Sequence, residues 1–181
     1  QQLPLLEDYE KGVFVRYFLL RANQLEYLEV NKKTYNNIHT KNSSWAWENY
    51  IPFTLEWYIK GDIDRTFNNN KGLIFIKEEE LERKGLKEYL GTQYLQYFEY
   101  SEANNLTTGG GELLTPSGQN YIGSYHIHKA QGPMAGPTHM KTPHAKLFYK
   151  RFYKDRKVDS LNQEGVIKAE ETRRIEFSND L

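Results

Sequence analysis

The stretch that decides the fold is Val13-Phe-Val-Arg-Tyr-Phe-Leu-Leu-Arg21, which is followed after a short break by Leu25-Glu-Tyr-Leu-Glu-Val30. Both segments are rich in the β-branched and aromatic residues that are enriched in strands. Ala22-Asn-Gln24, which separates them, has the composition of a turn. These residues therefore predict a β-hairpin near the start of the chain.

Two short helices are predicted after this hairpin. Asn31 is a good N-cap for a helix over residues 32–39, and Ser44 could cap a second helix over residues 45–50. Pro52 should end the second helix, because proline lacks the amide hydrogen that a helix requires.

The next part of the chain predicts one more strand and a long helix. Apolar and polar residues alternate from Phe53 to Ile59, which predicts a third strand, and Gly61 marks a turn. Leu73-Ile-Phe-Ile76 is a short apolar run that fits a helix or a strand equally well. Residues 78–98 are predicted to be helical, with a break at a glycine.

The composition of the chain changes at Ser101, which predicts an α+β fold in two parts. Residues 1–100 are expected to form a compact α+β domain, built on the N-terminal β-hairpin or a small sheet with helices. Residues 101–112, which end in a triple glycine, are expected to be a Gly-rich linker. Residues 113–181 are expected to form an extended C-terminal arm that holds the histidines, a basic and aromatic stretch, and a small hairpin turning at residues 116–119.

Composition and charge exclude several classes of function. The 181 residues include 24 Lys and Arg and 24 Asp and Glu, so the formal net charge is zero. A neutral chain has no overall field that attracts nucleic acid or an anionic membrane, and no apolar run is long enough to cross a bilayer. The chain has no cysteine, which excludes disulfides, thiolate ligands and cysteine nucleophiles. Its 14 tyrosines suit surfaces that are buried against partners, and equally a Tyr-rich core.

Four of the five histidines lie in one segment, from Tyr121 to Leu147. On a strand, His126 and His128 would point to the same face, since they are two residues apart. The Gly- and Pro-rich residues 132–137 could fold the chain back and bring His139 and His144 to the same place. A set of four imidazoles suits a transition metal ion such as Zn²⁺ or Fe²⁺, and also Ni²⁺ or Cu²⁺. The alternatives are that the histidines bond to backbone groups or stack on aromatic rings, or that several copies share one site on a symmetry axis.

A basic and aromatic stretch runs from Lys146 to Lys157 and could bind a nucleic-acid backbone or an acidic neighbouring protein subunit. We favour protein docking because the chain as a whole is neutral. The residues expected at such an interface are Tyr125, Met134, Phe148, Tyr149, Lys150, Arg151, Phe152 and Tyr153.

No pattern in the chain predicts a catalytic residue. Gly109-Gly-Gly111 is not followed by the Lys and Ser or Thr of a phosphate-binding loop. Asp62 and Asp64 lack the Gly and Glu that a calcium loop requires, and Ser117 lacks the glycine pattern of hydrolase nucleophiles.

The histidine segment also resembles a known motif. The shared residues are Tyr125-His-Ile-His128, Gly132-Pro-Met134, Gly136, His139, Pro143-His144 and Leu147. This pattern is similar to one in small virion proteins of large contractile-tailed (myovirus-type) phages, notably marine ones, where it occurs at the C-terminal end of baseplate, tail or neck components. The N-terminal Tyr9-Glu-Lys-Gly12 and Arg16-Tyr-Phe18 are similar to phage proteins that begin with a "KG…RYF" pattern. The loop differs in one respect, because Lys129-Ala-Gln131 stands where the pattern has an early proline.

This resemblance implies a non-enzymatic structural role in a virion that is assembled in the host cytoplasm. It implies partners among other virion proteins and multiple copies in a symmetric assembly. Together with the neutral charge and the basic and aromatic stretch, we expect docking through the C-terminal arm, without a membrane and without nucleic acid. It assigns no catalytic residue and settles no cofactor. Two other functions remain open: a metal-dependent enzyme or metal-binding protein that uses the four histidines, and a nucleic-acid-binding module that uses residues 146–157.

Overall fold

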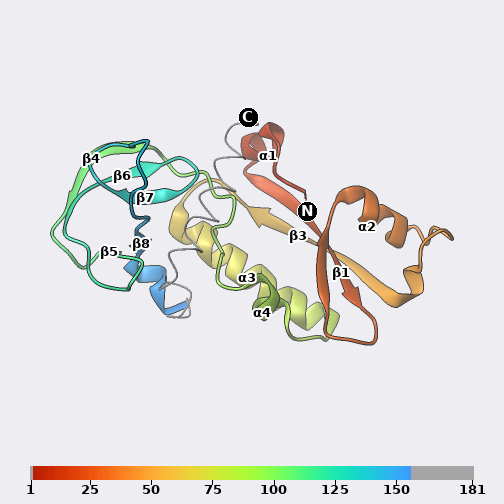
Figure 1. Ribbon diagram of the computed structural model, residues 1–181. Helices are drawn as coiled ribbons and strands as arrows, with labels where there is room; N and C mark the ends of the chain where they lie inside the picture. Colours follow the sequence, from red (N-terminus) through yellow and green to blue (C-terminus); the bar gives the residue numbers. More distant parts are fainter. Residues whose placement is uncertain (1, 156–181) are drawn as a thin grey trace. The chain divides into compact units, whose positions relative to one another are not determined.

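The computed structural model in Figure 1 describes residues 2–155 and divides the chain into two compact units, Gln1–Phe98 and Glu99–Leu181. Antiparallel sheets occur in both units, and the α-helices lie in the first. The predicted α+β class is therefore confirmed. Residues 156 and 157, which belong to the predicted basic stretch, and the rest of the expected arm lie outside the described residues.

Unit 1 is built on a three-stranded antiparallel sheet of β1 (Val13–Arg21), β2 (Tyr27–Val30) and β3 (Tyr50–Tyr58), in the order β2-β1-β3. The predicted hairpin is β1 and β2, and the predicted third strand is β3. Pro52 does not precede β3 as predicted but lies inside it, opposite Leu19 of β1. This is possible because β3 pairs with β1 alone, and an edge strand tolerates a residue that cannot donate to a second neighbour.

The short helices of unit 1 are α1 (Leu6–Lys11), α2 (Lys32–His39) and the 3₁₀ turn η1 (Trp47–Asn49). The predicted cap of α2 is present, because Oδ1 of Asn31 accepts a 2.8 Å hydrogen bond from the Thr34 amide. Only the single turn η1 forms where a helix over residues 45–50 was expected. Helix α1 lies before β1 and is capped at its C-terminus by Gly12, whose φ of +76° is left-handed.

Residues 73–76, whose sequence fits a helix or a strand, lie in the long helix α3 (Ile63–Leu81). The carboxylate of Asp62 caps its first turn by accepting from the Arg65 amide at 2.8 Å. A second, shorter helix, α4 (Leu86–Leu90), lies between two glycines, so only part of the helix predicted over residues 78–98 forms. The buried face of α3 consists of Thr66, Phe67, Asn70, Ile74 and Glu78.

A buried ion pair ties β1 to β2 within unit 1. The guanidinium of Arg16 donates to both carboxylate oxygens of Glu29, at 2.8 and 3.0 Å, and lies 4.7 Å from the ring of Trp57. Arg16 is 2% exposed. A guanidinium removed from water needs such bidentate and aromatic partners, because its desolvation is costly.

Unit 2 contains the sheet that positions the histidines, with strands β4 (Ala103–Thr108), β6 (Gly123–His128) and β7 (Gly132–Ala135) in the order β4-β6-β7. Residues 101–112 differ from the expected linker, because they include β4, which pairs with β6. The predicted small hairpin also differs: its turn at residues 115–119 is present, but β6 pairs with β4 and β7. A second ladder joins β5 (Leu113–Leu114) to β8 (Phe148–Tyr149), and the 3₁₀ helix η2 (Lys150–Asp155) follows.

Residues 136–147, which we call the histidine loop, connect β7 to β8 and return along the edge of β7. The Ala135 amide donates to the Ala145 carbonyl, and the Leu147 amide donates to the Pro133 carbonyl, each at 2.9 Å. The start of the loop is also bonded to β4, since the Asn105 amide donates to the Pro137 carbonyl at 2.7 Å. Backbone hydrogen bonds therefore fix both ends of this loop.

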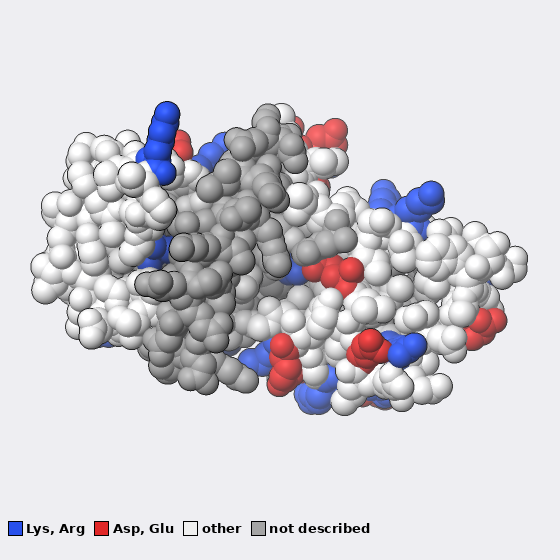
Figure 2. Space-filling model, viewed as in Figure 1, with Lys and Arg blue, Asp and Glu red and all other residues white. Residues whose placement is uncertain are grey.

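The surface charge agrees with the neutral composition. On the face drawn in Figure 2, basic and acidic side chains are interspersed rather than gathered by sign. Within residues 2–155, no helix combines the length and the apolar character that crossing a membrane requires.

Candidate metal centre

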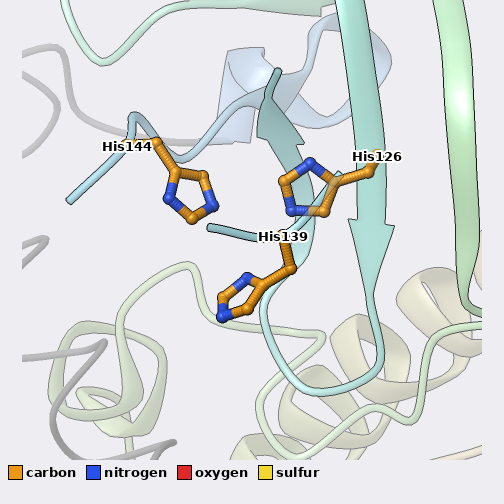
Figure 3. Close-up of side chains that lie close together, drawn as sticks. All are labelled: His126, His139 and His144. Carbon is orange, nitrogen blue, oxygen red and sulfur yellow. The ribbon is translucent and has the colours of Figure 1, made fainter. Parts of the chain in front are cut away.

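Three histidines of unit 2 form a compact group, which we call the histidine triad. His126 projects from β6, while His139 and His144 come from the histidine loop (Figure 3). Each residue offers a ring nitrogen, and these three nitrogens all lie within 4.8 Å of one another. This group could hold a metal ion.

Backbone carbonyls determine which ring nitrogen carries the hydrogen in two members of the triad. Nδ1 of His126 donates to the Gly136 carbonyl, and Nδ1 of His144 donates to the Thr142 carbonyl, both at 2.9 Å. A carbonyl can only accept, so the hydrogen of each neutral ring lies on Nδ1, and Nε2 carries the lone pair. Metal-binding histidines in proteins are commonly oriented in this way.

The two Nε2 atoms are buried and have no hydrogen-bond partner among the described residues. A buried acceptor without a partner is costly, roughly 1–3 kcal/mol. A cation bound between the rings would satisfy both lone pairs at once. These two unsatisfied nitrogens therefore indicate a ligand, independently of the fact that the three histidines cluster.

His139 completes the triad from a more exposed position. Its ring centroid lies 5.8 Å from that of His126 and 5.1 Å from that of His144. Its side chain is exposed, whereas His126 is buried and His144 is half-buried. The triad thus has a buried side at β6 and an open side at His139.

His128 lies beside the triad, but backbone amides already bind one of its ring nitrogens. Its ring centroid is 5.0 Å from that of His139, so it lies near the triad, as expected from its spacing after His126. Its Nδ1 accepts hydrogen bonds from the amides of Ala130 and Gln131, both at 3.2 Å. In the neutral ring Nε2 then carries the hydrogen and is no longer a metal ligand. Of the four predicted histidines, His126, His139 and His144 form the group that could hold a metal ion, and His128 lies beside it.

Binding an ion requires the triad to contract slightly. With Zn–N distances of about 2.0–2.1 Å, two ligand nitrogens of a tetrahedral site lie about 3.4 Å apart. The nitrogens here lie within 4.8 Å, so one or more rings must move by about 1 Å. His139 is the member most able to move, because it is exposed and lies in a loop.

The conformation of the chain at the first residue of β7 and at the residue after β7 depends on glycine. Gly132 has φ of +80°, and a Cβ added there would lie 2.9 Å from Cζ of Tyr100. Gly136 has φ of +97° and supplies the carbonyl that orients His126. Residues with a side chain rarely adopt these backbone conformations. Residues 132–137 were expected to fold the chain back, but residues 132–135 form the strand β7. The chain reverses in the turn before β7 and again in the histidine loop.

The expected interface residues differ in how far they are exposed. Met134 and Phe148 are buried in this chain, at 1% and 8% exposure, so the expected docking role does not fit them. Lys150 and Arg151 are exposed, and the Arg151 guanidinium lies 4.5 Å from the ring of Tyr149 and 4.7 Å from that of Phe152. Tyr125 is half-buried on β6, and Tyr153 lies in η2.

Two carbonyls of the site, those of Gly136 and Thr142, were not predicted, and Gly136 was identified only as part of a motif. Both act through backbone atoms, so the identity of the side chain carries little signal for their role.

No protein-family model, curated protein or solved structure matches this chain.

Proposed function

We propose that this protein is a non-enzymatic structural component of a tailed-phage particle, with a place in the tail, baseplate or neck. In this proposal the histidine triad holds one Zn²⁺ or Fe²⁺ ion that fastens the histidine loop to β6. One observation carries it: the motif through which the sequence resembles phage virion proteins contains the residues that build the triad. His126, His139 and His144 are its ligands, and Gly136 orients one of them.

The surroundings of the triad support a stabilising role for the ion. Side chains from Pro137 to Pro143 are exposed, so this part of the loop buries little apolar area. A metal ion bound by two histidines of the loop and one of β6 would supply the missing stabilisation, because its binding free energy adds to the folding free energy. The group contains no carboxylate that could serve as a general base beside the ion.

The ligand chemistry favours Zn²⁺ or Fe²⁺. Neutral imidazole is a good donor for both ions, and the absence of cysteine removes the thiolates that select softer metals. His126 and His144 present Nε2 without a preceding loss of a proton, because their hydrogens lie on Nδ1.

Docking on other virion proteins is assigned to the exposed part of the C-terminal stretch. Lys150 and Arg151 are exposed, and the Arg151 guanidinium lies over the rings of Tyr149 and Phe152, which combines charge with flat apolar area. Aromatic residues and arginine are enriched in protein interfaces. Repeated weak contacts of this kind would hold many copies together in a symmetric particle.

A metal-dependent enzyme is the second candidate, and one observation favours it. Three protein ligands with one open position are the usual arrangement of catalytic zinc, whereas structural zinc sites are closed by four. Loss of stability without the ion would favour the structural role. A chain that keeps its full stability without the ion, and hydrolyses activated esters only when loaded, would favour the enzyme.

The metal is tested by elemental analysis of the protein purified without added metal or an affinity tag containing histidine. We expect about one Zn or Fe per chain. His139→Ala should lose the metal, and His39→Ala should keep it. His39 is a suitable control because it lies on α2 of unit 1 and stacks on Tyr35 with ring centroids 5.3 Å apart. Equal metal contents in the two variants would contradict the assignment.

The place in a particle is tested separately. An antibody against this chain should detect it in the particle fraction of a density gradient from a lysed host culture. Detection solely in the fractions of free protein would contradict the virion role and would leave the metal site unaffected.

A further inference from the structure

We infer that the ion on the histidine triad keeps one coordination position for a carboxylate that another molecule supplies. This inference rests on the proposed metal binding and adds the class of ligand that completes the site. Four observations support it: the number of ligands, the hydrogen bonds that His128 already makes, the exposure of His139 and the charge of the site.

The number of ligands leaves a position open. Zn²⁺ takes at least four ligands in proteins, and Fe²⁺ usually takes more. Among residues 2–155, the group that could hold an ion consists of His126, His139 and His144. No fourth histidine, aspartate or glutamate of this part of the chain joins them.

His128 is the nearest candidate for a fourth ligand, and its hydrogen bonds oppose that role. Its Nδ1 already accepts from two successive backbone amides, those of Ala130 and Gln131. To bind the ion through Nδ1, the ring would have to break both hydrogen bonds. Each amide would then lose its acceptor, which is costly. To bind through Nε2, it would have to lose the proton that this nitrogen carries in the neutral ring.

The open position faces the exposed side of the triad. Nε2 of His126 and Nε2 of His144 are closed off from solvent, whereas His139 is exposed on its loop. In Figure 3 the three rings converge from β6 and from two points of the histidine loop. A ligand would therefore reach the ion past His139 rather than past β6.

The charge of the site selects an anion. Three neutral imidazoles leave a divalent ion with its full charge of +2, and no carboxylate lies in the group to offset it. A carboxylate oxygen binds both Zn²⁺ and Fe²⁺ well, at about 2.0–2.2 Å for Zn²⁺. Acetate and the side chain of an acidic residue on a second copy share this chemistry, so both are candidate sources.

The test uses the full-length protein loaded with Co²⁺, whose visible d–d bands depend on the coordination number and on the ligands. Sodium acetate is titrated against sodium perchlorate at constant ionic strength, because perchlorate binds metal ions weakly. We expect the bands of the wild type to change saturably with acetate and to stay constant in perchlorate. His128→Ala should give the same titration, since His128 does not occupy the position.

A spectrum that ignores acetate would overturn the inference, because a donor of this chain would then fill the position. A wild-type protein that develops no Co²⁺ bands would instead contradict the proposed metal binding itself. A dilution series without acetate identifies the source of the carboxylate. If the spectrum at high protein concentration matches the acetate-saturated one and reverts on dilution, a second copy supplies the carboxylate; a constant, acetate-sensitive spectrum assigns the position to a small free carboxylate.

Discussion

Nδ1 of His126 on β6 donates its hydrogen to the main-chain carbonyl of Gly136, at 2.9 Å. This bond joins the buried histidine of the triad to the first residue of the histidine loop, the same loop that supplies His139 and His144. The loop therefore also orients the ring of His126, which lies outside it. Any change that displaces the loop should disturb all three rings together.

Metal binding should stabilise the protein against heat. A ligand that binds the native state alone adds about 2.7 kcal/mol when its concentration is 100 times its Kd. We expect Zn²⁺ to raise the melting temperature of wild type and of His39→Ala, and a chelator to reverse the rise. His144→Ala should respond to neither. A rise of the same size in His144→Ala would show that Zn²⁺ acts elsewhere.

Substitution of Gly132 should cost more than substitution of a glycine with a similar backbone. Gly111 has φ of +85°, close to the +80° of Gly132, but a Cβ there would meet nothing within 4 Å. Each change to alanine should cost about 1–2 kcal/mol for the left-handed conformation. Gly132→Ala should cost a further ~1–3 kcal/mol, because its Cβ would overlap the ring of Tyr100. Urea unfolding measures both; equal losses would contradict the close contact.

The buried ion pair of the first hairpin should matter far more than the exposed one beside it. Arg16→Ala removes the bidentate cation that Glu29 binds in this buried pair, which should cost about 3–5 kcal/mol. Arg21→Ala breaks the Arg21–Glu26 pair, whose side chains are 46% and 48% exposed, and should cost less than about 1 kcal/mol. Chemical denaturation of the two variants compares these free energies of unfolding. Similar values would mean that the Arg16 pair contributes no more than a surface pair.

The stability of unit 1 should fall at alkaline pH because the hydroxyl of Tyr27 ionises more readily in the unfolded state. Burial raises the pKa of the Tyr27 hydroxyl above its ordinary value of 10.0, and the carboxylates of Glu78 and Glu88 raise it further. Below pH 10.0 both the folded and the unfolded state keep the proton. Above it the unfolded state loses the proton first, so the free energy of unfolding declines as the pH rises through the raised pKa.

Tyr27→Phe separates this effect from other alkaline losses. The variant also loses the 2.9 Å hydrogen bond to the Lys84 carbonyl, so it should be less stable at neutral pH by about 0.5–1.5 kcal/mol. Its decline above about pH 10 should nevertheless be shallower than that of the wild type. Denaturant midpoints measured against pH show this difference, and parallel curves would rule out Tyr27 as the cause.

Local patterns predicted the parts of the fold that depend on neighbours in sequence. The β1–β2 hairpin and the Asn31 cap follow from strand-forming residues, a turn and one side chain that accepts from an amide. The apolar run at residues 73–76 could not be assigned, because three polar residues on the buried face of α3 hide its helical period. Asn70 is fully buried there because its amide bonds to the backbone of Tyr58 and Tyr94.

Pairing between distant segments was harder to predict. Ala103–Thr108 is polar and precedes a triple glycine, so nothing local identifies it as the partner of β6. The candidate site was predicted as a cluster of four histidines, and the structure draws three of them together. The difference at His128 comes from two backbone amides, whose positions depend on the turn after β6 and not on residue type.

The histidine loop begins directly after β7, which is itself the hairpin partner of β6. All three histidines of the triad, and the two carbonyls that orient His126 and His144, consequently lie in one unbroken stretch between Gly123 and Leu147. One β-hairpin and the loop that follows it therefore encode the whole group, so a single contiguous peptide contains every residue that the triad requires.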